Sequence, residues 1–272
     1  AELTKGDSFA AARQRVVAAL LSPSDAALLS DPNNTLGIEY GRALLRVGAA
    51  PALFTIPRTG AAHDATPENA GGYSASAIRH LLAEGRRADA LSRMVPAMRA
   101  VYEAEESAGR APVFAAACER AILARLRSMT PAEFDALDTG HEGVGQRLYN
   151  ASRNAATLDA VLNNAKTKRY AYARLRRMVL WAYLGLTPAK LPASVPYLRV
   201  LAANEIGRAL LGRMRKTARL PVITKPAAIR SLFPDAQRLF ETESRAADLY
   251  ALAYPELTEA CGSLWRQNPV MP

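Results

Sequence analysis

The sequence is poor in cysteine and histidine. Its 272 residues include two cysteines, Cys118 and Cys261, and three histidines. The cysteines stand far apart and neither has a C-x-x-C partner, which excludes a disulfide framework and a cysteine-based zinc cluster. Such sparse cysteine usage is typical of proteins that work in a reducing cytoplasm.

Long apolar runs are absent as well. No stretch of about 18 apolar residues occurs, and the start of the sequence has no signal-peptide pattern. We therefore expect no membrane span and a cytoplasmic location. Half of the residues are hydrophobic and 22% are charged, which excludes a disordered or fibrous chain. The length fits one large domain or two modest ones, at ~100–200 residues each.

Acidic side chains are nearly missing from residues 143–230, which hold 17 basic and 2 acidic residues. The formal charge of the whole chain is +10, so this basic block carries more than the entire excess. Uncompensated like charges repel each other and cost stability. We therefore expect the block to bind a polyanion, and nucleic acid before a membrane, because no long basic amphipathic anchor is present. The alternative is a solvated basic surface kept for solubility.

The first 85 residues are predicted to form an α/β fragment. Its expected elements are helices over residues 8–21, 25–29, 36–47 and 74–84, a turn at 31–35, an apolar strand at 52–56 and a loop at 57–73. A single strand makes no sheet. Either it packs against the helices of this chain, or its sheet lies in sequence outside the chain. Since the first residue is also not methionine, we expect a fragment of a longer protein.

The rest of the chain is predicted to be almost wholly helical. The expected helices cover about residues 90–107, 112–128, 131–137, 145–163, 166–184, 197–217 and 235–252, and the one later strand candidate is 220–226. The predicted fold class is therefore mainly α with a small α/β part.

Two stretches near the start of the chain carry side chains suited to phosphates. In PNNTLGIEY, residues 32–40, Asn33 precedes a predicted helix, where it would either cap backbone N–H groups or leave them to a phosphate. The second stretch runs from TIPR, ending at Arg58, to SASAIR, which contains Ser74, Ser76 and Arg79. A serine-rich helix start with an arginine one turn in is a good phosphate cradle, although serine is also a common helix cap.

These stretches together resemble a known family. The order PNNxLGxEY, TIxR, the pair His63-Asp64 and SASxIR is similar to that of the tRNA(Met) cytidine acetate ligases, a nucleotidyltransferase-like family. Segments KTKRY at 166–170, PYLRVL at 196–201 and PVITK at 221–225 continue the resemblance in order. It implies a remnant of a Rossmann-like nucleotidyltransferase domain over residues 1–85, followed by a helical, basic tRNA-binding domain over residues 86–272.

The resemblance implies an ATP-dependent ligase. Members of the family use ATP and acetate to form acetyl-adenylate, and then acetylate the wobble cytidine of elongator tRNA(Met). By the match, Asn33 and Arg58 would contact ATP, and we expect them to converge on one pocket. Ser74, Ser76 and Arg79 would bind its phosphates. Magnesium would accompany the ATP.

One feature of the family is missing. The family has an N-terminal half with an H-x-G-H signature, which stabilises the phosphates as charge develops during adenylyl transfer. None of His63, His80 and His141 stands in such a motif. We therefore expect residues 1–272 to be inactive alone. Two alternatives are a non-catalytic tRNA- or rRNA-binding module and another nucleotidyltransferase with a small-molecule substrate, which would not need the basic block.

The basic block supplies the candidate RNA-binding residues. In a single helix over residues 166–184, a stripe of cations would lie opposite the apolar face, with Tyr170 and Trp181 interleaved as stacking platforms for unpaired bases. Alternatively, Trp181 packs under a neighbouring helix. The predicted RNA-binding residues are Lys166, Lys168, Arg169, Tyr170, Arg174, Arg177, Arg208, Arg215 and Lys225.

Overall fold

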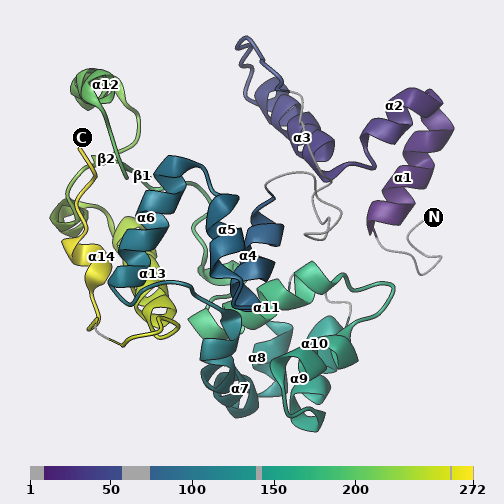
Figure 1. Ribbon diagram of the computed structural model, residues 1–272. Coiled ribbons are helices and arrows are strands. Elements are labelled where there is room, and N and C mark those ends of the chain that lie inside the picture. Colours follow the sequence, from purple (N-terminus) through teal and green to yellow (C-terminus); the bar gives the residue numbers. More distant parts are fainter. Residues whose placement is uncertain (1–8, 57–73, 139–142, 258, 272) are drawn as a thin grey trace.

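A computed structural model describes residues 9–56, 74–138, 143–257 and 259–271, and statements on structure below concern these residues. Helices dominate the described chain, and its two strands have two residues each. The predicted fold class, mainly α with a small α/β part, is confirmed (Figure 1).

The first three helices stand together at one side of the molecule (Figure 1). They are α1 (Phe9–Leu20), α2 (Pro23–Leu28) and α3 (Pro32–Arg46). The turn expected at residues 31–35 is wrong, because α3 already begins at Pro32. Proline suits this first helical position, where its missing N–H costs nothing. Asp31 caps the helix, and its Oδ1 accepts hydrogen bonds from the backbone N–H groups of Asn33 and Asn34 at 2.7 and 3.2 Å.

The strand expected at residues 52–56 is also wrong, since this segment has no regular secondary structure. Its apolar side chains face solvent, with 91% of Phe54 and 92% of Ile56 exposed. A strand exists only through hydrogen bonds to a neighbouring strand. The described residues place no such neighbour beside this segment.

The next three helices are α4 (Ala75–Ala83), α5 (Arg87–Ser92) and α6 (Pro96–Ser107). As expected, α4 closes before Gly85, which adopts the left-handed φ of 74°. The single helix expected over 90–107 is interrupted, because Pro96 restricts Val95 to extended backbone. Ile78 and Leu81 of α4 pack against Leu91 of α5. The expected domain boundary after residue 85 runs between these packed helices, and the division into two domains stays a prediction.

Five helices and one 3₁₀ turn share the largest core. They are η2 (Ala115–Cys118), α7 (Glu119–Ser128), α8 (Pro131–Asp135), α9 (Val144–Asn154), α10 (Leu158–Ala165) and α11 (Tyr172–Leu184). Each helix contributes a fully buried side chain, namely Leu126, Phe134, Leu148, Val161 and Leu175 in chain order. The helix expected over 145–163 is two helices, because Thr157 caps a new one with a hydrogen bond from Ala160 N–H to its Oγ1.

The C-terminal part combines both strands with further helices. Its elements are η3 (Pro188–Lys190), β1 (Leu198–Arg199), α12 (Glu205–Thr217), β2 (Val222–Ile223), η4 (Pro226–Ser231), α13 (Pro234–Ala251) and α14 (Ser263–Arg266). The strands pair in parallel, with Leu198 opposite Val222. The strand expected in 220–226 is confirmed. The helix expected from residue 197 begins only at Glu205, because residues 198–199 join the sheet instead.

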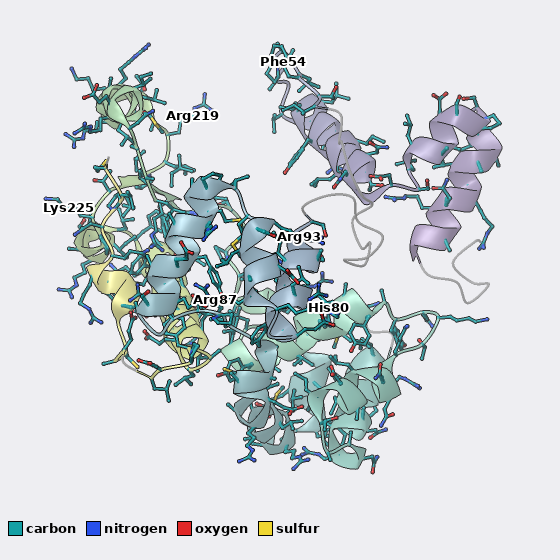
Figure 2. All side chains as sticks on the ribbon, in the orientation of Figure 1. Phe54, His80, Arg87, Arg93, Arg219 and Lys225 are labelled. Atoms are coloured by element: carbon teal, nitrogen blue, oxygen red, sulfur yellow. The ribbon has the colours of Figure 1, made fainter. Side chains whose placement is uncertain are left out.

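α12 projects from the body at one end of the molecule (Figure 1). It contains no buried residue. Figure 2 shows Arg219 and Lys225 on the part of the molecule that carries α12.

None of the described helices combines the length and apolar character needed to cross a membrane. Cys118 is buried and Cys261 is exposed, and both are free thiols.

Candidate functional site

Asn33 occupies the first turn of α3 with its side chain exposed. The cap of this helix is Asp31 rather than Asn33, because the Asp31 carboxylate already accepts the N–H groups there. A negative cap makes the backbone at this helix end a poor phosphate site. Any contact of Asn33 with ATP would therefore come from its exposed side-chain amide. Arg58 lies outside the described residues, so its convergence with Asn33 stays a prediction.

Ser74, Ser76 and Arg79 gather at the start of α4. Ser74 caps the helix by accepting a hydrogen bond from the Ala77 N–H at 3.1 Å. One turn on, Nη2 of Arg79 donates to Oγ of Ser76 at 3.4 Å. Arg79 is exposed and Ser76 is half-buried. A guanidinium beside a hydroxyl at a helix N-terminus offers donors that suit a phosphate.

Among the residues that the structure describes, no group of three His, Cys, Asp or Glu side chains could hold a metal ion.

The helix expected to begin at Lys166 begins at Tyr172 instead. Lys166 ends α10, and residues 166–171 form a non-helical link. The Tyr170 N–H donates to Oγ1 of Thr167 at 3.1 Å, which holds the link in a turn. The cations Lys166, Lys168 and Arg169 are exposed in this link, whereas Tyr170 is only 7% exposed. In this arrangement the ring of Tyr170 is not available for stacking on a base.

Arg174 and Arg177, both on α11, were expected to act together, but their environments differ. Arg177 is exposed. Arg174 turns towards Asp138, with Nη2 at 2.6 Å from Oδ2 and Nε at 3.2 Å from Oδ1. Trp181 is half-buried against the core, as the alternative interpretation expected. Of the stripe predicted on this helix, Arg177 therefore remains accessible to RNA.

Three predicted RNA-binding residues do come together at α12. Arg208 and Arg215 of α12 and Lys225, which follows β2, line one open groove of about 480 Å³. The C-terminal segment completes its wall with Asn268, because Val270 forms a parallel bridge to Ala202. All three cations are exposed. The rest of the lining is largely apolar and includes Leu211 and Met271. The three cations of this groove, called the α12 groove below, suit contacts with a polyanion such as a phosphate backbone.

A second cavity, of about 550 Å³, contains residues that sequence reasoning missed. It lies between α4, α6, the segment after α6 and the end of α13, and Arg79 lines it. Arg110 binds Glu105 there through Nε–Oε2 and Nη2–Oε1 contacts of 2.6 and 2.8 Å. This hydrogen bonding lowers the pKa of the Glu105 carboxyl. The sequence signal that could have located these residues is the pair Glu105 and Arg110 on either side of Gly109. Gly109 follows the end of α6 with a left-handed φ of 70°, and the chain turns there so that Arg110 folds back onto Glu105.

Comparisons with known proteins agree with the resemblance. A family model described as HIGH Nucleotidyl Transferase matches residues 1–263. The tRNA(Met) cytidine acetate ligase of Acetivibrio thermocellus is 31% identical over 286 residues, covering 99% of this chain and 68% of that protein. The ligase of Thermotoga petrophila is 28% identical, covering 96% of this chain and 67% of its own length.

Solved structures show the same relationship. The crystal structure of Thermotoga maritima TmcAL in its apo form matches with a TM-score of 0.89 at 25% identity, covering 99% of this chain and 68% of that one. The form bound with alpha-thio ATP matches with a TM-score of 0.85 at 26% identity over the same shares. The match along residues 1–263 and the 31% identity over nearly the whole chain show that this protein belongs to the tRNA(Met) cytidine acetate ligase family of HIGH nucleotidyltransferases.

Proposed function

We propose that this chain binds tRNA for the ATP-dependent acetylation of the wobble cytidine of elongator tRNA(Met). The observation that carries the proposal is the α12 groove, in which Arg208, Arg215 and Lys225 converge from separate elements. They do so inside a block of 17 basic and 2 acidic residues. A small acceptor would need no cationic surface of this extent, which argues against a small-molecule nucleotidyltransferase.

The proposed reaction has two steps. A carboxylate oxygen of acetate attacks the α-phosphorus of ATP, forming acetyl-adenylate and releasing pyrophosphate. The exocyclic amine of cytidine then attacks the acetyl carbonyl, AMP leaves, and the amine loses a proton to solvent. Ser76 and Arg79 would donate hydrogen bonds to phosphate oxygens, and preorganised donors of this kind stabilise charge that develops during the transfer.

Asn33 and Arg58 are proposed as further ATP contacts, and Ser74 as the cap that fixes the start of α4. Magnesium would partly neutralise the ATP phosphates when bound. The exposed cations Lys166, Lys168, Arg169 and Arg177 would extend the RNA surface beyond the α12 groove. Tyr170 and Arg174, also predicted to bind RNA, would support this surface from beneath, because both are largely buried.

A non-catalytic RNA-binding module is the second candidate function. Two observations favour it, namely the absence of an H-x-G-H motif in residues 1–272 and the lack of a described sheet beside residues 52–56. Both functions need the RNA surface, and they differ in whether ATP chemistry accompanies it.

A salt titration of tRNA binding tests the RNA surface. Each phosphate contact should contribute roughly 0.7–0.9 to the slope of log K against log salt. Replacing Arg208, Arg215 and Lys225 with alanine should therefore flatten the slope by up to about 2–3. A variant with Arg120→Ala, Arg238→Ala and Arg245→Ala removes three exposed cations outside the block and should keep most of the slope.

Circular dichroism controls for folding, and α12 should persist because alanine is a better helix former than arginine. Equal slopes in wild type and the groove variant would move the RNA path away from α12. If the wild type binds no tRNA at low salt, the basic block is a solvated surface.

A further inference from the structure

We infer that the 550 Å³ cavity between α4, α6 and the end of α13 receives the unstacked cytosine base of the RNA substrate. The inference rests on the proposed function and adds a base-recognition site to it. The residues that carry the argument are Arg79, Tyr102, Glu105, Arg110, Tyr250 and Tyr254. The cavity is called the base pocket below.

Aromatic side chains give the base pocket a stacking surface. Tyr250 and Tyr254 meet edge to face, with ring centroids 5.8 Å apart and an interplanar angle of 88°. Tyr250 lines the cavity and is 56% exposed, so its side chain is accessible to a ligand. Single-stranded bases in RNA are commonly held by stacking on such rings.

A fixed donor and acceptor stand beside these rings. Arg110 is held against Glu105 by two hydrogen bonds of 2.6 and 2.8 Å. Each carboxylate oxygen has two acceptor positions, so Glu105 retains capacity for a further donor. Nη1 of Arg110 forms an ion pair with Oε1 of Glu259 at 3.8 Å, which is beyond hydrogen-bond distance, so its N–H groups make no hydrogen bond to Glu259.

This pair matches the polar edge of cytosine. Cytosine presents an amine donor at N4 beside acceptors at N3 and O2, whereas uracil presents an acceptor at position 4 and a donor at N3. Glutamate accepts well from the cytosine N4 amine. The lowered pKa of Glu105 keeps its carboxylate ionised and therefore an acceptor only. Uracil would place its O4 against that carboxylate.

The location of the base pocket suits the proposed reaction. Arg79, proposed to bind the phosphates of ATP, lines the same cavity. A base held here would therefore share the cavity with a residue proposed to bind the ATP phosphates. Tyr102 packs against the core shared by α4 and α5, so it fixes α6 relative to Arg79.

Photocrosslinking tests the site directly. An RNA hairpin with one 5-iodocytidine in its loop is irradiated with the wild-type chain, and the modified peptide is identified by mass spectrometry. We expect the crosslink at Tyr250 or Tyr254, and a weaker one from the matching 5-iodouridine hairpin. Excess adenosine is added in parallel, because adenine also carries an exocyclic amine and adenosine has no phosphate for Arg79 to bind.

Affinity measurements with variants add a second readout. Tyr250→Ala should weaken hairpin binding by roughly 5- to 150-fold, which is the range expected for loss of one base stack. Tyr250→Phe should bind as the wild type does, because the ring is retained. Glu105→Gln should reduce the preference for cytidine over uridine, since its amide can also donate to O4. Glu103→Gln should leave that preference unchanged, because Glu103 lies on the same helix but is bound to Arg99.

The outcomes separate this inference from the proposed function. If the hairpin binds with a steep salt slope but Tyr250→Ala binds equally well and the crosslink lies elsewhere, the base pocket is wrong and the RNA surface stands. Loss of the crosslink with adenosine would assign the cavity to adenine and overturn the inference. No hairpin binding by the wild type at low salt would overturn both.

Discussion

The guanidinium of Arg174 is held by Asp138 through two contacts, Nη2–Oδ2 at 2.6 Å and Nε–Oδ1 at 3.2 Å. The side chains are 23% and 14% exposed, so the pair is mostly shielded from solvent. It joins α11 to the segment that follows α8. Arg174 therefore stabilises the helical core, whereas its neighbour Arg177 is exposed.

This difference predicts opposite effects of two arginine replacements. Arg174→Ala should lower the free energy of unfolding by roughly 1–3 kcal/mol, because shielded hydrogen bonds to a charged group are lost. Arg177→Ala should leave stability within about 0.5 kcal/mol and lower the salt slope of tRNA binding by roughly 0.7–0.9. Urea unfolding and a salt titration measure the two quantities. Equal stability of both variants would contradict a structural role for Arg174.

The missing H-x-G-H motif predicts that residues 1–272 alone do not activate acetate. Without that phosphate-stabilising signature, charge developing on ATP in the transition state lacks a main source of compensation. Acetate-dependent exchange of pyrophosphate into ATP by the purified chain is the measurement, and it should equal the rate without protein. Exchange above that background would show that the catalytic centre lies within these residues and would exclude the non-catalytic module.

Two helical glycines predict opposite responses to alanine. A Cβ on Gly145 of α9 would lie 2.8 Å from the backbone N and Cα of Asp135, so α8 would have to move. Gly145→Ala should cost roughly 1–3 kcal/mol of stability. Apart from the surrounding helix backbone, no atom lies within 4 Å of a Cβ added to Gly41 of α3. Gly41→Ala should stabilise by about 0.5–1 kcal/mol through helix propensity. Thermal unfolding compares them, and a Gly145→Ala protein as stable as wild type would refute the close α8–α9 contact.

Acid should weaken the link between α5 and α6. Hydrogen bonds from Arg87 lower the pKa of Glu106 below its ordinary value of 4.5. The stabilisation is therefore present above about pH 4.5 and is lost as pH falls through the lowered pKa. Glu106→Gln should destabilise at neutral pH and lose less stability on acidification than wild type. Urea unfolding across this range measures the effect, with Glu241→Gln on α13 as an exposed control. Parallel pH curves for wild type and Glu106→Gln would contradict it.

Local signals predicted much of the helical structure. The helix at α4 was expected because Ser74 caps it and Gly85 closes it, and both features depend on residues within one turn of the helix end. The interruptions at Pro96 and Thr157 were missed. A new helix begins at each of these points although the apolar periodicity continues through it. The strand at 52–56 was predicted from apolar residues alone, although a strand also needs a partner.

The candidate site divides in the same way. The charge of residues 143–230 was plain from composition, but composition does not say which cations are accessible. Tyr170 is buried, and Arg174 forms an ion pair with the Asp138 carboxylate. Arg208, Arg215 and Lys225 meet in one groove because β1 pairs with β2 and brings the chain on both sides of α12 together.

The sequence by itself determined the mainly helical fold class, the family and the basic block, because these depend on residue type, local caps and the order of motifs. Tertiary structure alone decided which cations share a groove and which are used in the core. It also brought Glu105 and Arg110 to the tyrosines at the end of α13. The physical reason is that strand pairing, ion pairing and burial join residues far apart in the chain, and their energies depend on partners that no local pattern specifies.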